Sequence, residues 1–133
     1  MTTAKLMEIL KQLNENGYQV CIFALKDGLP IASKKIPECT YNEKMVSAMG
    51  AMLSEGAERA KEDMGLADLE YFKTIYGNAC IVCQNIKTST GQVYLLIGLT
   101  DKPENDDVDK YNEKLFDWAI ENALPVLEEL SNL

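Results

Sequence analysis

The fold of this chain is decided by the stretch from Thr40 to Gly65, which reads TYNEKMVSAMGAMLSEGAERAKEDMG. Thr40 and Glu43 have the spacing of a capping box, and Gly65 is a residue type that often ends a helix. The pattern therefore predicts one helix of about six turns. Its apolar side chains recur at helical spacing, and we expect one stripe of them to pack on a sheet: Val46, Met49, Leu53, Ala57, Ala60 and Met64.

A second band of small and apolar residues widens this stripe on one side. It consists of Met45, Ala48, Met52 and Gly56, with Arg59 at its border. One small sheet cannot cover so wide a band, so the excess apolar surface indicates a protein partner. The alternative is that flanking loops cover this side of the helix.

Length and charge limit the possible functions. A chain of 133 residues has the size of one domain, which we expect to extend over residues 1–133. The formal net charge of −8 argues against nucleic acid and anionic membranes, because both select clustered Lys and Arg. No apolar run approaches the roughly 20 residues of a membrane span, and the N-terminus, MTTAKLMEIL, lacks a secretory signal pattern. We therefore expect a cytoplasmic protein without membrane insertion.

The other elements follow from hydrophobic periodicity and turn residues. Helices are predicted from about Thr3 to Asn16 and, after a polar loop over residues 100–112, up to about Ser131. Pro125 should kink or break this last helix. The dipeptides Asp27-Gly28 and Gly77-Asn78 predict two hairpin turns. Five strands are expected, at residues 18–25, 29–34, 69–76, 79–86 and 92–99.

Two of these strands, at residues 18–25 and 92–99, are apolar on both faces and therefore belong at the centre of the sheet. Pro30 places the second strand at an edge, and the strand at residues 69–76 forms the other edge. The fold class is α+β, in which a five-stranded antiparallel sheet carries the middle helix on one face and both terminal helices on the other.

The edge strand at residues 69–76 carries little protection, because its only interior charges are Glu70 and Lys73. Unpaired backbone groups on such an edge invite another strand. Pairing with the same strand of a second copy would give a ten-stranded sheet and place two middle helices side by side. The residues expected in this contact are Met45, Met49, Met52, Gly56, Tyr71, Phe72, Lys73 and Thr74, although Met49 could instead belong to the core.

Catalytic and metal-binding patterns are missing from the sequence. There is no histidine, and the glycines do not have the spacing of a phosphate-binding loop. Cys80 and Cys83 lie three apart on a predicted strand, so their thiols should point to opposite faces and share no metal. We therefore expect no catalytic residue, no metal and no cofactor. The acidic residues between Asp101 and Asp109 are expected to favour the start of the last helix.

Arg59 is the only arginine of the chain. It could reach the phosphate of a partner as an arginine finger does. The competing interpretation is an exposed ion pair with Glu55, one helical turn earlier.

The order of elements, the hairpin motif K-D-G-L-P-I-A-S and the helix motif M-V-S-A-M-G-A-M-L-S-E-G-A-E-R-A resemble the roadblock/dynein light-chain family. The resemblance extends from about Leu6 to Leu130. It implies a non-enzymatic scaffold or regulator that forms homodimers, or heterodimers with a related roadblock protein, through the second helix and third strand. It also implies binding to a Ras-like small GTPase or to an assembly that contains one.

Two other classes remain open. A profilin-like actin-binding protein has a similar length and architecture, and V-Y-L-L-I-G-L-T-D-K-P before a terminal helix is similar to it. The N-terminal helix lacks the Trp and Tyr that profilins use to hold polyproline. A small-molecule sensor domain is the third class, but no convergent polar cluster in the apolar strands indicates a ligand.

Overall fold

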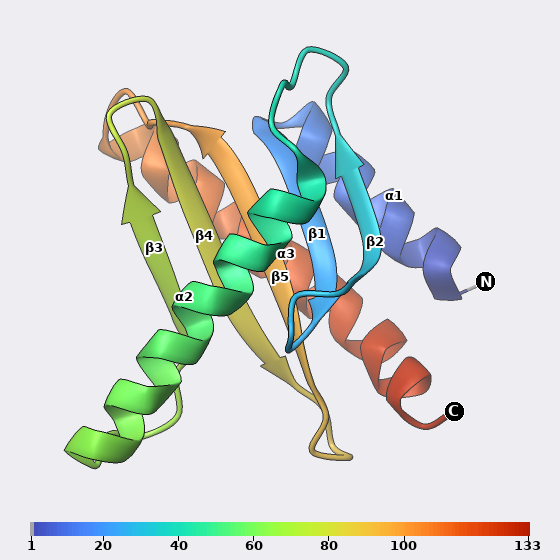
Figure 1. The fold of residues 1–133 in the computed structure, drawn as a ribbon. Coiled ribbons are helices and arrows are strands. Elements are labelled where there is room, and N and C mark those ends of the chain that lie inside the picture. Colours follow the sequence, from blue (N-terminus) through green and yellow to red (C-terminus); the bar gives the residue numbers. More distant parts are fainter. Residues whose placement is uncertain (1) are drawn as a thin grey trace.

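A computed structural model describes residues 2–133 of the chain (Figure 1). Five strands form one antiparallel sheet in the order β2-β1-β5-β4-β3. This arrangement confirms the predicted sheet, with β1 and β5 at its centre and β2 and β3 at its edges. The elements are α1 (Thr2–Glu15), β1 (Tyr18–Leu25), β2 (Pro30–Lys35), α2 (Glu43–Met64), β3 (Tyr71–Ile75), β4 (Ala79–Lys87), β5 (Val93–Asp101) and α3 (Asp106–Ser131).

The helices form two layers around this sheet, as the sequence predicts. α2 crosses one face of the sheet, and α1 and α3 lie together on the other (Figure 1). Each layer has its own apolar core. Ile22 and Ile97 lie in the core under α2, whereas Phe23 and Leu96 lie in the core under α1 and α3. Neighbouring residues of β1 and β5 thus point to opposite cores, which explains why both strands are apolar on both faces.

The first hairpin has the predicted Asp-Gly turn. Gly28 has φ +92°, a conformation that residues with a side chain rarely adopt. The Asp27 carboxylate accepts a hydrogen bond from the Leu29 backbone N–H at 3.0 Å, which closes the turn.

The beginning of α2 differs from the prediction. Its N-cap is Asn42, whose side chain accepts a hydrogen bond from the Met45 backbone N–H at 3.1 Å. The predicted capping box of Thr40 and Glu43 is wrong, because the Glu43 carboxylate instead accepts a hydrogen bond from the Ser33 hydroxyl on β2. The predicted end is confirmed, since Gly65 has the left-handed conformation (φ +70°).

The last helix is longer than the sequence predicted. α3 begins at Asp106 after the N-cap Asn105, within a segment that was predicted to be loop. Acidic residues in its first turn, as expected, lie where the helix dipole favours negative charge. The helix continues past Pro125 to Ser131, so the predicted break does not occur. β3 is shorter than predicted.

Candidate functional site: the outer face of α2 and the edge strand

The face that α2 turns to the sheet is made of small residues. Its buried positions are Val46, Ser47, Gly50, Ala51 and Ser54. The backbone of α2 lies so close to β5 at position 50 that only glycine fits there. A Cβ added to Gly50 would lie 2.8 Å from Cδ1 of Ile97.

The predicted sheet-packing stripe is confirmed at Val46, is half-buried at Ala57, and is wrong at its large residues Met49, Leu53 and Met64. Met49 and Leu53 are each 37% exposed, and Met64 is more exposed still. The close approach of the helix excludes these long side chains from the contact with the sheet.

The opposite face of α2 is apolar and exposed. Met45 and Met52 each expose 66% of their surface, and an added Cβ at Gly56 would meet no described atom within 4 Å. We call this surface the outer face, and it consists of Met45, Met49, Met52, Leu53 and Gly56. The flanking loops do not cover it, so the alternative interpretation of the widened stripe is also wrong.

β3 forms one edge of the sheet. It pairs with β4 on one side, and no strand of residues 2–133 pairs with its other side. Phe72 points to the α2 side and packs against that core, whereas Tyr71 on the other side is 51% exposed. Thr74 is half-buried. The structure thus has an open backbone edge at β3 and an exposed apolar face on α2, the helix that covers the side of the sheet to which Phe72 points.

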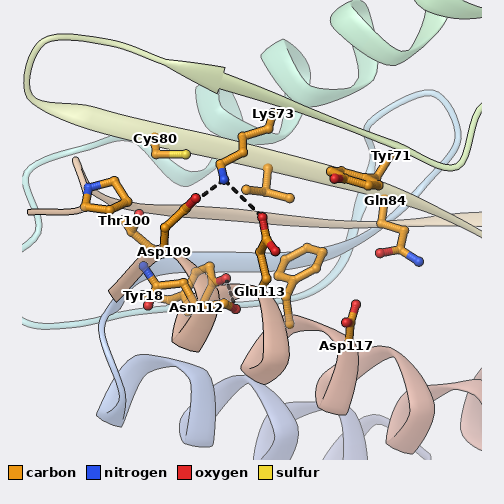
Figure 2. Close-up of a pocket in the computed structure, with 13 residues that line it drawn as sticks. Tyr18, Tyr71, Lys73, Cys80, Gln84, Thr100, Asp109, Asn112, Glu113 and Asp117 are labelled. Atoms are coloured by element: carbon orange, nitrogen blue, oxygen red, sulfur yellow. Dashed lines mark hydrogen bonds and ion pairs between the residues drawn. The ribbon is translucent and has the colours of Figure 1, made fainter. Parts of the chain in front are cut away.

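Lys73 points away from α2 and under the sheet towards α3 (Figure 2). Its ammonium donates to the Asp109 carboxylate at 2.6 Å and to the Glu113 carboxylate at 3.3 Å. Burial lowers the pKa of Lys73, but these two hydrogen bonds outweigh that effect and raise it above its usual value. The side chain of Lys73 is therefore held within its own chain and ties the edge strand to α3.

Comparison with known proteins identifies this arrangement. No family model and no characterised sequence matches the chain. Among solved structures, the gliding protein MglB of Thermus thermophilus superposes with a TM-score of 0.77, 13% identity, and coverage of 96% of this chain and 92% of that chain. The Roadblock/LC7 domain of Streptomyces avermitilis gives a TM-score of 0.74 at 13% identity, covering 91% and 96%. The chain has the roadblock fold.

A second MglB structure, described as a tetrameric arrangement, superposes with a TM-score of 0.77 at 13% identity and covers 96% of this chain and 91% of its own. At these identities the similarity concerns the fold. In this roadblock fold no described helix is both long and apolar enough to cross a membrane.

Arg59 lies beside the outer face, with 77% of its side chain exposed. Its guanidinium donates to the Glu55 carboxylate at 3.1 Å, which confirms the predicted ion pair. An exposed pair of this kind leaves the side chain free to exchange partners, because it contributes little to stability.

The cysteines of this roadblock fold are buried and free. Burial raises the pKa of Cys21 and of Cys83 to about 12, so their thiols stay protonated and unreactive at neutral pH. Cys83 lies in the core under α2, whereas Cys80 faces the α3 side, as the spacing predicted. Within residues 2–133, no group of three His, Cys, Asp or Glu side chains could hold a metal ion.

One feature of the α3 side was missed by sequence reasoning. A cavity of about 110 Å³ lies between the edge of the sheet and the first half of α3 (Figure 2). Lys73, Asp109 and Glu113 lie on its wall. A signal was present, since Asp109, Glu113 and Asp117 recur every four residues, but their segment was partly predicted as loop.

Proposed function

We propose that this chain is a non-enzymatic, cytoplasmic scaffold or regulator, built as a single roadblock domain over residues 1–133. It forms a dimer through the outer face of α2 and the edge of β3, and as a dimer it binds a Ras-like small GTPase or an assembly that contains one. The observation that carries the proposal is that one subunit has both an open edge at β3 and an exposed outer face on α2.

Two kinds of exposed surface favour association with a second copy. When a second α2 packs against the outer face, the apolar surface of the exposed methionines is removed from water, which is favourable. Their flexible thioethers also adapt to an irregular partner surface. The unpaired N–H and C=O groups of β3 gain partners when a second β3 adds to the sheet. In the proposed dimer both gains come from one contact, in which the second copy adds its β3 to this sheet and packs its α2 against this α2.

Each predicted contact residue has a role in such a dimer. Met45, Met49, Met52 and Gly56 lie on the outer face and would contact the second α2. Tyr71, Phe72, Lys73 and Thr74 contribute the backbone of the added strand pair. The side chain of Lys73 already binds two carboxylates of α3, so we assign only its backbone to the contact.

Two findings support the choice of partners. The tetrameric arrangement of one MglB indicates that this fold assembles with copies of itself, and a heterodimer with a related roadblock protein would use the same surfaces. The resemblance of the sequence to the roadblock/dynein light-chain family adds a small GTPase as the partner. The acidic surface is consistent with a protein partner rather than nucleic acid.

The dimer is tested by placing a carboxylate in each half of the contact. Met52→Glu and Tyr71→Glu should each convert the dimer to a folded monomer, because an unpaired charge in a buried contact costs several kcal/mol in the idealised case. Multi-angle light scattering at micromolar concentration measures the mass, and circular dichroism verifies the fold. Leu124→Glu is the matched control, because Leu124 is an exposed apolar residue of α3 on the opposite layer. A wild-type monomer, or two variants that remain dimeric, would refute this contact.

GTPase binding is tested separately with purified Ras-like GTPases from the same genome. We expect at least one to bind the wild-type dimer with an affinity that depends on the bound nucleotide, and to bind Met52→Glu more weakly. Isothermal titration calorimetry with the GDP-loaded and GTP-analogue-loaded forms provides the measurement. If the dimer forms but no GTPase binds in either nucleotide state, the GTPase part of the proposal is refuted and only the dimer remains supported.

A further inference from the structure

The backbone groups of β3 alternate in direction along the strand, and this alternation limits how a second strand can pair with it. The Tyr76 N–H donates to the Ala79 carbonyl at 2.7 Å, and the Asn85 N–H donates to the Glu70 carbonyl at 3.1 Å. In an antiparallel ladder such residues turn both backbone groups to the same neighbour, so the even positions of this segment face β4. The odd positions of β3 face outwards at the open edge, and they are Tyr71, Lys73 and Ile75.

An antiparallel β3 from a second copy can pair with these outward groups in few registers. In the register centred on Lys73, this residue lies opposite Lys73 of the second copy, and Tyr71 lies opposite Ile75 of the second copy. Every outward N–H and C=O group of the strand then has a partner. A register centred on Phe72 leaves Ile75 beyond the end of the other strand, and one centred on Thr74 leaves Tyr71 beyond it. The register centred on Lys73 therefore forms the most hydrogen bonds.

The side chains of β3 favour the same register. Tyr71 and Ile75 lie on the α3 side of the strand and expose 51% and 58% of their surface. Opposite each other in two chains, they form an aromatic–β-branched pair that removes apolar surface from water. Phe72 and Thr74, on the α2 side, form a second pair of the same kind. No apolar side chain of the strand is left without a neighbour across the pair.

This register also places two lysines opposite each other, which is unfavourable for free ammonium groups. In this chain the Lys73 ammonium donates to Asp109 at 2.6 Å and to Glu113 at 3.3 Å, both on its own α3 (Figure 2). The two bonds hold the ammonium under the sheet, and the carboxylates compensate its charge. The Asp109 and Glu113 side chains are 33% and 52% exposed, so solvent screens the remaining negative charge.

We propose that β3 pairs with β3 of a second copy of this chain in the register centred on Lys73, and that Asp109 and Glu113 make this self-pairing possible by holding the lysine. The inference rests on the proposed dimer. It adds the identity of the second chain, the position of the twofold axis and a positioning role for the two carboxylates of α3.

Disulfide crosslinking of the full chain tests the register. In Tyr71→Cys/Ile75→Cys, each new cysteine lies opposite the other position of the second copy, with about 5.5 Å between Cα atoms, which a disulfide can span. Mild oxidation should therefore give a covalent dimer on a non-reducing gel. The single variants Tyr71→Cys and Ile75→Cys are matched controls and should not crosslink, because identical positions lie four residues apart, about 13 Å along the strand. The wild type is the blank, because its own cysteines are buried.

Light scattering of the wild type separates failure of the register from failure of the dimer. A dimeric wild type without a crosslink in the double variant would overturn the register and leave the dimer in place. A monomeric wild type would refute the dimer and the register together. Equal crosslinking of the single variants would show thiol contact without a fixed register, which also overturns the proposal.

A double-mutant cycle tests the role of the two carboxylates. Asp109→Asn/Glu113→Gln frees the Lys73 ammonium and should raise the dissociation constant of the dimer about threefold to tenfold at low salt, and less at high salt. In the Lys73→Met background the same two changes should have no such effect, because no ammonium remains at the axis. Analytical ultracentrifugation measures the dissociation constant, and circular dichroism verifies the fold. Equal weakening in both backgrounds would show that the carboxylates act without Lys73 and would overturn their assigned role.

Discussion

The two faces of α2 differ in residue size more than in polarity. The face on the sheet carries Gly50, Ala51 and two serines among its buried residues, whereas the outer face carries three methionines. Small residues bring the helix axis close to the sheet, and long side chains are left outside. The difference shows that the close contact within the chain is made by the small residues, and that the large apolar residues remain available for a second chain.

The difference in residue size between the two faces of α2 explains why the sequence prediction assigned the wrong stripe of residues to the sheet. Hydrophobic periodicity gives most weight to large side chains, so Met49, Leu53 and Met64 were assigned to the sheet. Helix packing also depends on how closely the backbones approach, and close approach selects glycine, alanine and serine. Gly50 against Ile97 is the position where this requirement is strongest.

The largest effect on stability is expected when valine replaces a glycine on each face of α2, in two separate variants. Gly50→Val should destabilise the fold by about 3 kcal/mol, because the new side chain overlaps Ile97 and forces the helix off the sheet. Gly56→Val meets open space and should be neutral or slightly stabilising, because valine is a better helix former than glycine. Urea unfolding measures both free energies.

These measurements need two protein concentrations. An effect that does not change with concentration belongs to the folded subunit, whereas one that changes belongs to assembly. Equal destabilisation by the two glycine variants at both concentrations would show that the faces are not distinguished by close packing.

A smaller effect on stability is expected from Ser54, a buried polar residue on the face of α2 that packs on the sheet. The Ser54 hydroxyl donates to the side-chain oxygen of Asn85 on β4 at 3.1 Å, and Asn85 in turn donates to Glu58 at 3.3 Å. Ser54→Ala should cost about 1 kcal/mol, because a buried hydrogen bond is lost and the Asn85 oxygen loses its donor. Glu62→Ala is the control, since this exposed side chain makes no such bond within the described chain. An equal change in the melting temperature of both variants, measured by thermal unfolding, would contradict a structural role for this hydrogen bond.

Local rules predicted much of the fold because the deciding residues act locally. The Asp27-Gly28 turn, the Gly65 helix end and the doubly apolar central strands each follow from backbone preference or alternation within a few residues. The start of α3 was missed because acidic residues were interpreted as a loop, although Asn105 and the first-turn carboxylates form a favourable helix start.

The candidate site was predicted less completely, because its parts meet only in three dimensions. The outer face and the open edge could be expected from sequence, since each is one continuous segment. The cavity could not, because Thr100, Lys73 and Asp117 come from three elements whose alignment depends on the strand register. A pattern within one segment carries no information about that register.

The smallest effect on stability is expected at the border of the outer face. Arg59→Ala removes one exposed ion pair with Glu55 and should change the free energy of unfolding by about 0.5 kcal/mol or less. Its effect on a partner decides between the two interpretations of this residue. If Arg59 reaches a GTPase as an arginine finger, Arg59→Ala should lower the rate of GTP hydrolysis in the complex by about a thousandfold. Arg59→Lys should restore little of it, because lysine lacks the planar fork of donors. A rate that is the same for wild type, Arg59→Ala and Arg59→Lys would leave Arg59 as an exposed charge beside the contact.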